Sequence, residues 1–203
     1  MTQSLFDRTG NRKYLVARER QSFVVAAVAE GGAVGAFCLT LAFTGARISE
    51  ALALTPERLD ASNEAIVFET LKQRRKAVFR AVPIPHQLLF IIGDTTGVSE
   101  ADVTVRRLWP WGRTTAWKRV KRVMKAAGIV DALCKPKALR HGFAVDAGQN
   151  GVPLNIVQRW LGHARIETTA IYASAIGEEE RNLARRAWSS LELTLPDRTN
   201  VPS

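Results

Sequence analysis

Residues 161–172 read LGHARIETTAIY, near the end of a chain of 203 residues. An apolar stripe ahead of Gly162 predicts a helix over residues 154–161, with the glycine at its exit. His163 therefore follows a helix end, and Tyr172 stands nine residues further on in a second short helix. Composition alone favours a packing role for this tyrosine, because aromatic rings usually serve a core or an interface. Evidence for a functional role of Tyr172 must therefore come from other residues of the sequence.

Two further fragments place an arginine beside a helical apolar pattern. Residues 44–50 read TGARISE, and residues 137–141 read KALRH. Arg47 is expected at the start of a short helix just past a glycine turn, and Arg140 inside a longer helix. A guanidinium can donate two parallel hydrogen bonds to phosphate oxygens and stays charged at working pH. A lone arginine is more often a surface residue paired to a carboxylate, so the two fragments together favour phosphate binding.

The charge balance indicates a polyanionic partner. Lys and Arg number 29 against 19 Asp and Glu, which leaves a net charge of +10 and a pI of about 10.3. Such an excess favours nucleic acid through counterion release. An anionic membrane surface is a weaker alternative, since neither a clear basic amphipathic segment nor a lipid anchor is present. The apolar stretch 23–43 is interrupted by glycines and a glutamate, so no membrane span is expected.

Length and composition suit one soluble globular domain. Cys38 and Cys134 are far apart in the sequence, which predicts neither a disulfide nor a metal site and fits a reduced, cytoplasmic compartment. The N-terminal residues lack a signal-peptide layout. Because neither a phosphate-binding glycine loop nor a paired-carboxylate metal site is recognisable, no metal, nucleotide or redox cofactor is expected.

The hydrophobic pattern predicts a mainly α-helical fold with a small antiparallel β-sheet, an α+β class. Beside the short helix at Tyr172, helices are expected over residues 18–30, 34–43, 47–54, 86–92, 113–127, 137–149, 154–161 and 178–191. Two β-favouring runs, 65–70 and 77–83, flank the cationic segment 72–76 and predict a hairpin with a positive tip. The helix over 113–127 has an apolar stripe beginning at Trp117. Its opposite, basic face is either merely solvated or a contact for a nucleic-acid groove.

These fragments resemble the catalytic domain of tyrosine recombinases, the phage-integrase family. That family has an arginine in a T-G-x-R-x-S-E box, a lysine on a β-hairpin, an H-x-x-R box usually followed by His, an L-G-H box, and a tyrosine nine residues beyond its histidine. The match covers roughly residues 20–190. The resemblance implies 1–18 as a polar N-terminal lead, 19–176 as the recombinase catalytic domain, and 177–203 as a C-terminal helix and tail. That tail is either exchanged between protomers or packed on its own domain.

The resemblance implies DNA cleavage and rejoining through a 3′-phosphotyrosyl intermediate, without metal or ATP. Arg47 and Arg140 would clamp the scissile phosphate and oppose the charge of its transition state. Tyr172 would be the nucleophile. His163 would donate to a phosphate oxygen or hold the tyrosine in line, with a simple capping role after the helix as the alternative.

Lysines and two supporting residues complete the expected site. Lys72 would protonate the leaving 5′ oxygen, a transfer worth about 10²- to 10⁴-fold. Lys76 is the alternative acid, and the charges at the hairpin tip could instead only grip backbone phosphates. Lys137 replaces the family's usual histidine, so a role as base or as a third positive hydrogen-bond donor stays open. Glu50 is expected to orient the arginine three residues before it, and His141 to be a buried, hydrogen-bonded structural histidine.

The expected partners are double-stranded DNA and further copies of the chain. Family resemblance implies a homotetramer on two DNA sites, with an accessory DNA-bending or core-binding protein as a further candidate. About 20 residues before the first helix cannot form the separate N-terminal domain of most members, so the chain would be a minimal recombinase or a fragment. Two other functions fit less well: a type IB topoisomerase, and a non-cleaving DNA-binding regulator on the same fold. The filled catalytic positions argue against lost cleavage.

Overall fold

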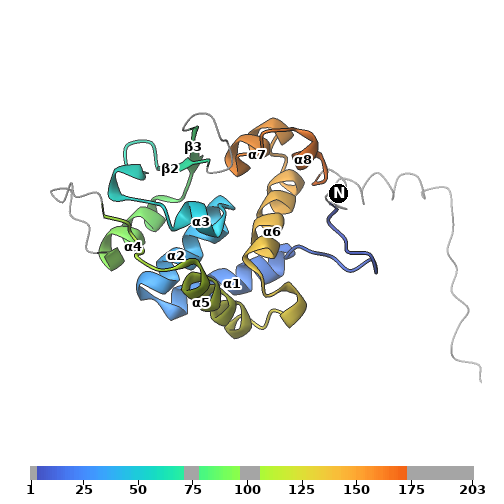
Figure 1. Ribbon diagram of the computed structural model, residues 1–203, viewed down its shortest axis with the longest axis horizontal. Coiled ribbons are helices and arrows are strands. Elements are labelled where there is room, and N and C mark those ends of the chain that lie inside the picture. Colours follow the sequence, from blue (N-terminus) through green and yellow to red (C-terminus); the bar gives the residue numbers. More distant parts are fainter. Residues whose placement is uncertain (1–3, 71–77, 97–105, 173–203) are drawn as a thin grey trace, which may run out of the picture.

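The computed structural model describes residues 4–70, 78–96 and 106–172 (Figure 1). The helices are α1 (Ala17–Glu30), α2 (Gly32–Thr44), α3 (Ile48–Ala51), α4 (His86–Thr96), α5 (Arg113–Ala126), α6 (Pro136–Gln149), α7 (Leu154–Leu161) and α8 (Glu167–Ala170), with 3₁₀ turns at Pro56–Arg58 and Asp131–Leu133. The strands are β1 (Leu59–Asp60), β2 (Ala65–Glu69) and β3 (Phe79–Pro83), in one antiparallel sheet of order β1-β2-β3. The predicted mainly helical α+β fold is confirmed. The expected helix over 178–191 lies outside the described residues.

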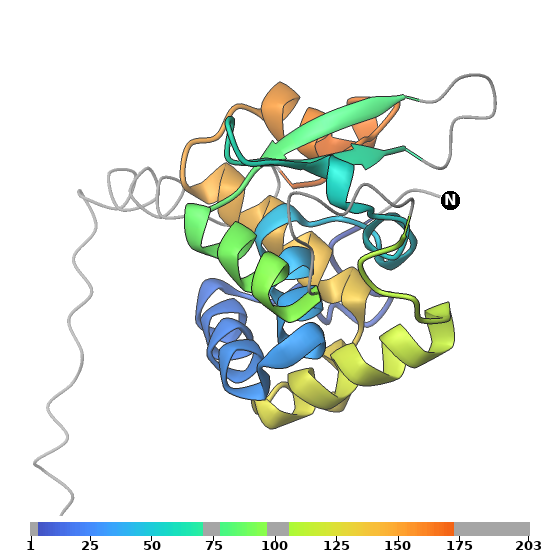
Figure 2. The ribbon, with the colours of Figure 1, turned by 90° about the vertical axis from the view of Figure 1, so that its left-hand side faces the viewer.

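Helix α2 is the main packing partner of the other helices. Its sequence, GAVGAFCLTLAFT, carries no charged residue, so most of its surface can be buried, and it packs against α1, α3, α4, α5 and α6. Helices α1, α2 and α5 lie at one end of the molecule, while the β2–β3 hairpin, α7 and α8 lie at the other (Figure 1; Figure 2). Helix α6 runs between the two ends and carries the second arginine fragment.

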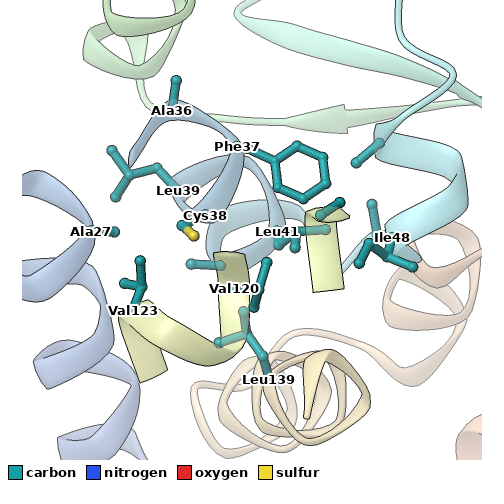
Figure 3. Close-up of a cluster of buried hydrophobic side chains, with 14 of the residues drawn as sticks. Ala27, Ala36, Phe37, Cys38, Leu39, Leu41, Ile48, Val120, Val123 and Leu139 are labelled. Carbon is teal, nitrogen blue, oxygen red and sulfur yellow. The ribbon is translucent and has the colours of Figure 1, made fainter. Parts of the chain in front are cut away.

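The main hydrophobic core forms where α2 meets α5 and α6. Phe37 and Cys38 of α2 share it with Val120 and Val123 of α5 and with Leu139 of α6 (Figure 3). Removing such apolar side chains from water stabilises the fold by about 25 cal/mol for each Å² buried. Burial also raises the pKa of the Cys38 thiol to about 12, so this cysteine behaves as a core residue and not as a reactive thiol.

The sheet is a hairpin with a third, very short strand. In the β2–β3 register, Phe68 lies opposite Arg80, and both side chains are buried. Strand β1 has two residues, too few for an alternating pattern, and the sequence did not predict it. The tip of the hairpin, with Lys72 and Lys76, lies outside the described residues.

The N-terminal residues take part in the core. Leu5 and Leu15 are almost completely buried, and the Leu15 N–H donates to the carbonyl of Ala138 on α6. Leu5 belongs to a second apolar cluster that contains Tyr172. The prediction of a polar lead is wrong for these two leucines, because single apolar residues in a polar run have no periodicity that reports burial. No helix in the described part of the chain has the length and apolar character needed to cross a bilayer.

The turn from α2 to α3 requires a glycine. Gly45 ends α2 with φ of 60°, in the left-handed region that other residues rarely adopt. A Cβ there would lie 2.5 Å from Phe143 Cδ1 and 3.1 Å from Leu161 Cδ2. Side chains from α6 and α7 therefore close onto this turn, which places Arg47 two residues later.

Replacing Gly45 with alanine should cost stability through both strain and overlap. We expect Gly45→Ala to lower the free energy of unfolding by about 2–4 kcal/mol, of which about 1–2 kcal/mol is the left-handed backbone and the rest steric displacement of Phe143. Gly128→Ala is the matched control, with φ of 72° and nothing within 4 Å of its added Cβ. The Gly128→Ala variant should lose only the part of the free energy of unfolding that comes from the left-handed backbone. Equal losses of the two variants in urea denaturation would contradict the packing account.

Candidate active site

A cavity of about 700 Å³ lies between α3, α5, α6 and the chain that follows α7. Side chains from all three sequence fragments line it. Those that the sequence singled out are Arg47, Lys137, Arg140, His141, His163 and Tyr172. Glu50 stands behind the cavity wall, and Lys72 lies outside the described residues. Residues far apart in the sequence therefore meet at one place.

Arg140 is held at the carboxyl-terminal ends of two helices. Its Nη1 donates to the Gly45 carbonyl at 2.7 Å and its Nη2 to the Leu161 carbonyl at 2.6 Å. Gly45 caps α2 and Leu161 ends α7, where free carbonyls and the helix dipole favour a cation. Burial, and next the charge of Arg47, lower the pKa of Arg140 to about 9. The guanidinium is therefore still charged at neutral pH.

Arg47 reaches the same carbonyl from the other side. It precedes α3, and its Nη1 lies 2.7 Å from Glu50 Oε1 and 3.5 Å from the Leu161 carbonyl oxygen. The Arg47 backbone N–H also donates to Glu50 Oε2, at 2.9 Å. The carboxylate therefore holds both the helix start and the guanidinium. The positive charges of Arg47 and Arg140 therefore lie close together at the end of α7. An anion bound in the cavity would reduce the repulsion between them.

Arg80 is a site residue that the sequence analysis missed. Its Nη2 donates to Glu50 Oε2 at 2.7 Å, its Nε to the Trp160 carbonyl at 2.7 Å, and its Nη1 to Thr70 Oγ1 at 3.1 Å. Burial pushes the pKa of Glu50 upward, but the charges of Arg80 and Arg47 outweigh it and hold that pKa below its ordinary value. The glutamate is a carboxylate shared by two arginines.

A sequence signal for Arg80 existed. It alternates with Val82 and Ile84, and all three are buried while Ala81 and Pro83 between them are exposed. An arginine in register with β-branched residues on the inner face of a strand requires a buried partner.

His163 has a defined tautomer. Its Nε2 lies 3.0 Å from Arg140 Nη2, and its Nδ1 lies 2.9 Å from Thr169 Oγ1. Because a guanidinium can only donate, Nε2 accepts, and we assign the ring proton to Nδ1. Burial, followed by Arg140 and Arg47, lowers the pKa of His163 to about 3. The neutral ring lies parallel to that of Tyr172, with 6.3 Å between centroids.

Tyr172 follows α8, and its hydroxyl contacts His141. The hydroxyl oxygen lies 2.9 Å from His141 Nδ1, and both side chains are buried. Burial, followed by the charges of Lys137 and Arg140, lowers the pKa of His141 to about 4. Burial raises the pKa of Tyr172, and Arg140 and Arg47 counteract part of this. A neutral imidazole can accept a hydrogen bond from the phenol. His141 is thus buried, and its hydrogen-bond partner is the candidate nucleophile.

Helix α5 also contributes to the wall of the cavity. Arg113 and Trp117 line the cavity, and Trp117 is 39% exposed. The prediction that Trp117 belongs to the buried stripe of this helix is wrong. The buried positions are Ala116, Val120, Val123 and Met124.

Among the residues that the structure describes, no three His, Cys, Asp or Glu side chains gather as a metal site.

The buried, neutral His141 should make stability depend on pH. With a folded pKa of about 4 against an ordinary 6.5, it takes up a proton on unfolding in this interval. The free energy of unfolding therefore falls as pH falls, by up to about 1.4 kcal/mol per pH unit. The variant His141→Gln keeps a hydrogen-bonding group and should reduce this dependence of the free energy of unfolding on pH. The measurement is urea denaturation between about pH 5 and pH 6.5, a range that lies above the ordinary pKa values of carboxylates. Parallel slopes for the two proteins would contradict this.

Comparisons with known proteins show the family to which the chain belongs. The sequence pattern described as "Phage integrase family" matches residues 29–178. Tyrosine recombinase XerD of Corynebacterium glutamicum is 33% identical over 158 residues, which cover 71% of this chain and 49% of the relative. XerD of Yersinia pestis is 32% identical over 150 residues, covering 69% and 49%. The chain spans about half the length of these relatives.

Solved structures share the fold. The crystal structure of XerA recombinase has a TM-score of 0.66 and 25% identity, and the match covers 86% of this chain and 62% of that one. The catalytic domain of bacteriophage HP1 integrase has a TM-score of 0.59 and 23% identity, covering 89% and 98%. With its helices, its sheet and its arginine and tyrosine fragments so arranged, the chain belongs to the phage integrase family.

Proposed function

We propose that this chain is the catalytic part of a site-specific DNA recombinase that cuts and rejoins strands through a phosphotyrosine. The supporting observation is that Tyr172, Arg47 and Arg140 line one cavity. A phenol with an ordinary pKa of about 10 attacks a negatively charged phosphodiester only with help. The two fixed guanidiniums supply it by opposing the charge that builds on the phosphate oxygens.

The proposed cleavage step is a single displacement at phosphorus. The Tyr172 oxygen forms a bond to phosphorus while the bond from phosphorus to the 5′ oxygen breaks, which leaves a 3′-phosphotyrosine and a 5′-hydroxyl. The phenol proton leaves to water or to a phosphate oxygen as the new bond forms, while His141 Nδ1, 2.9 Å from the Tyr172 oxygen, orients the hydroxyl. Lys72 is the proposed donor to the 5′ oxygen, and Lys137 a cationic donor to the phosphate. A 5′-hydroxyl of another strand reverses the reaction without ATP.

We propose double-stranded DNA as the partner, lying across the cavity and α5. Arg113 starts this helix in the cavity wall, and the guanidinium of Arg119 lies 4.0 Å from the centroid of the Trp111 ring. Further along helix α5, Arg122 forms an ion pair with Glu30. The net charge of +10 supports a phosphate backbone as ligand.

The proposed assembly is a tetramer. Exchange between two duplexes breaks four strands, and each chain would contribute one nucleophile, so four copies are needed. The two XerD relatives are about twice as long as this chain. We also propose a DNA-bending or core-binding protein as a candidate partner.

Covalent capture tests the proposal. Sheared and nicked genomic DNA from the encoding cells contains the natural site and lets the cleaved short strand diffuse away, so the adduct accumulates. We expect the 203-residue chain to form a protein–DNA adduct that survives denaturation. Tyr172→Phe should form none. The control is Tyr14→Phe, since these are the two tyrosines of the chain, and it should form the adduct normally. An adduct with Tyr172→Phe, or none with the unaltered chain, would refute the proposal.

Strand exchange separates recombination from relaxation. The captured sequence, placed twice in a supercoiled plasmid, should yield rearranged products that depend on both copies. Gel electrophoresis after restriction digestion measures them. Relaxed topoisomers without rearrangement would favour the type IB topoisomerase alternative, and binding without an adduct would favour a regulator.

A further inference from the structure

We propose that Arg80 is a positioning residue that keeps the phosphate clamp charged and in place, acting through Glu50 and the end of α7. The inference rests on the proposed function. Arg80 is absent from the residues that line the cavity, so it does not itself contact the phosphate.

Arg80 connects separate elements of the fold. From β3 it donates to Glu50 of α3, to the Trp160 carbonyl of α7 and to Thr70 beyond β2. Its guanidinium carbon lies 5.2 Å from the centroid of the Phe68 ring. The side chain is only 4% exposed, so these partners replace water.

The first effect of Arg80 is on charge. Glu50 faces Arg47 beside it and Arg80 from β3, with Arg140 of α6 also within electrostatic reach. If Glu50 had Arg47 as its only partner, the pair would be neutral and the cavity would lose a positive charge. Because Arg80 balances the carboxylate, the charge of Arg47 remains available to a phosphate.

The second effect is on the end of α7. The carbonyl of Trp160 accepts from Arg80, and the next carbonyl, of Leu161, accepts from Arg140 at 2.6 Å. Gly162 follows, and a Cβ there would lie 2.9 Å from Arg80 Nη1. Arg80 therefore packs against the turn that leads into His163, and removing it would loosen the carbonyl on which the clamp converges.

The main test is Arg80→Met, which keeps length and apolar contact with Phe68 but removes every donor. Using the captured duplex at saturating protein, we expect the single-turnover cleavage rate to fall about 10²-fold, as misplacement of catalytic groups typically does. The Kd for DNA in a filter-binding titration should change less than about threefold, since most of the affinity comes from backbone contacts elsewhere.

Neutralising Glu50 supplies the discriminating measurement. In the double variant Arg80→Met/Glu50→Gln, no uncompensated carboxylate remains to neutralise Arg47. We therefore expect the double variant to cleave about tenfold faster than Arg80→Met alone, a coupling that merely local destabilisation would not produce.

Two further variants separate folding from positioning. Arg20→Met also removes a partly buried arginine, one that pairs with Asp146 and donates to the Ala42 carbonyl. It should lower the melting temperature but leave the cleavage rate of folded protein near that of the unaltered chain. Should Arg80→Met fail to fold, Arg80→Lys takes its place: a lysine can pair with Glu50 but lacks the planar fork for the other two acceptors. It should cleave more slowly at an unchanged Kd.

The two proposals fail in different ways. If the unaltered chain forms no adduct, the proposed function is wrong. The positioning role is wrong if the unaltered chain cleaves and folded Arg80→Met, or its lysine substitute, cleaves within about threefold of it, or if Glu50→Gln brings no recovery.

Discussion

A buried guanidinium between two helix ends is the interaction on which this structure depends. Arg140 donates to Gly45 at the end of α2 and to Leu161 at the end of α7. Burying a cation is costly unless acceptors replace its water, and helix carboxyl ends supply both free carbonyls and a favourable dipole. To meet this need the two helices must end beside α6. Their meeting point is where the cavity forms, and the left-handed glycine caps of both helices allow the close approach.

The site as a whole is a positive cavity without imidazolium. Two arginines, Arg47 and Arg80, share one buried carboxylate, Glu50, while His141 and His163 are kept neutral by burial and by the neighbouring cations. The excess charge therefore comes from side chains that hardly titrate, and the histidines are left free to accept hydrogen bonds. Such a cavity suits a phosphodiester, whose negative charge it offsets.

Local elements followed closely from the sequence, and short or isolated features did not. Helix α7 has the predicted bounds because Pro153 and Gly162 mark its two ends. The hairpin was predicted from two β-favouring runs, but the third strand has only two residues. Trp117 belongs to the predicted helix and yet faces the cavity, since an amphipathic pattern cannot tell a core from a functional pocket.

The sequence by itself determined the family, the fold class and the order of the candidate site residues, because caps, turns and motif spacings are properties of neighbouring residues. Only the tertiary structure decided which partner each polar group takes. Glu50 pairs with Arg80 as well as Arg47, and the His141 ring meets the Tyr172 hydroxyl. These pairs join residues up to 31 positions apart. Their partners are chosen by the need to satisfy buried charges and donors once the helices have packed, a condition that no local pattern records.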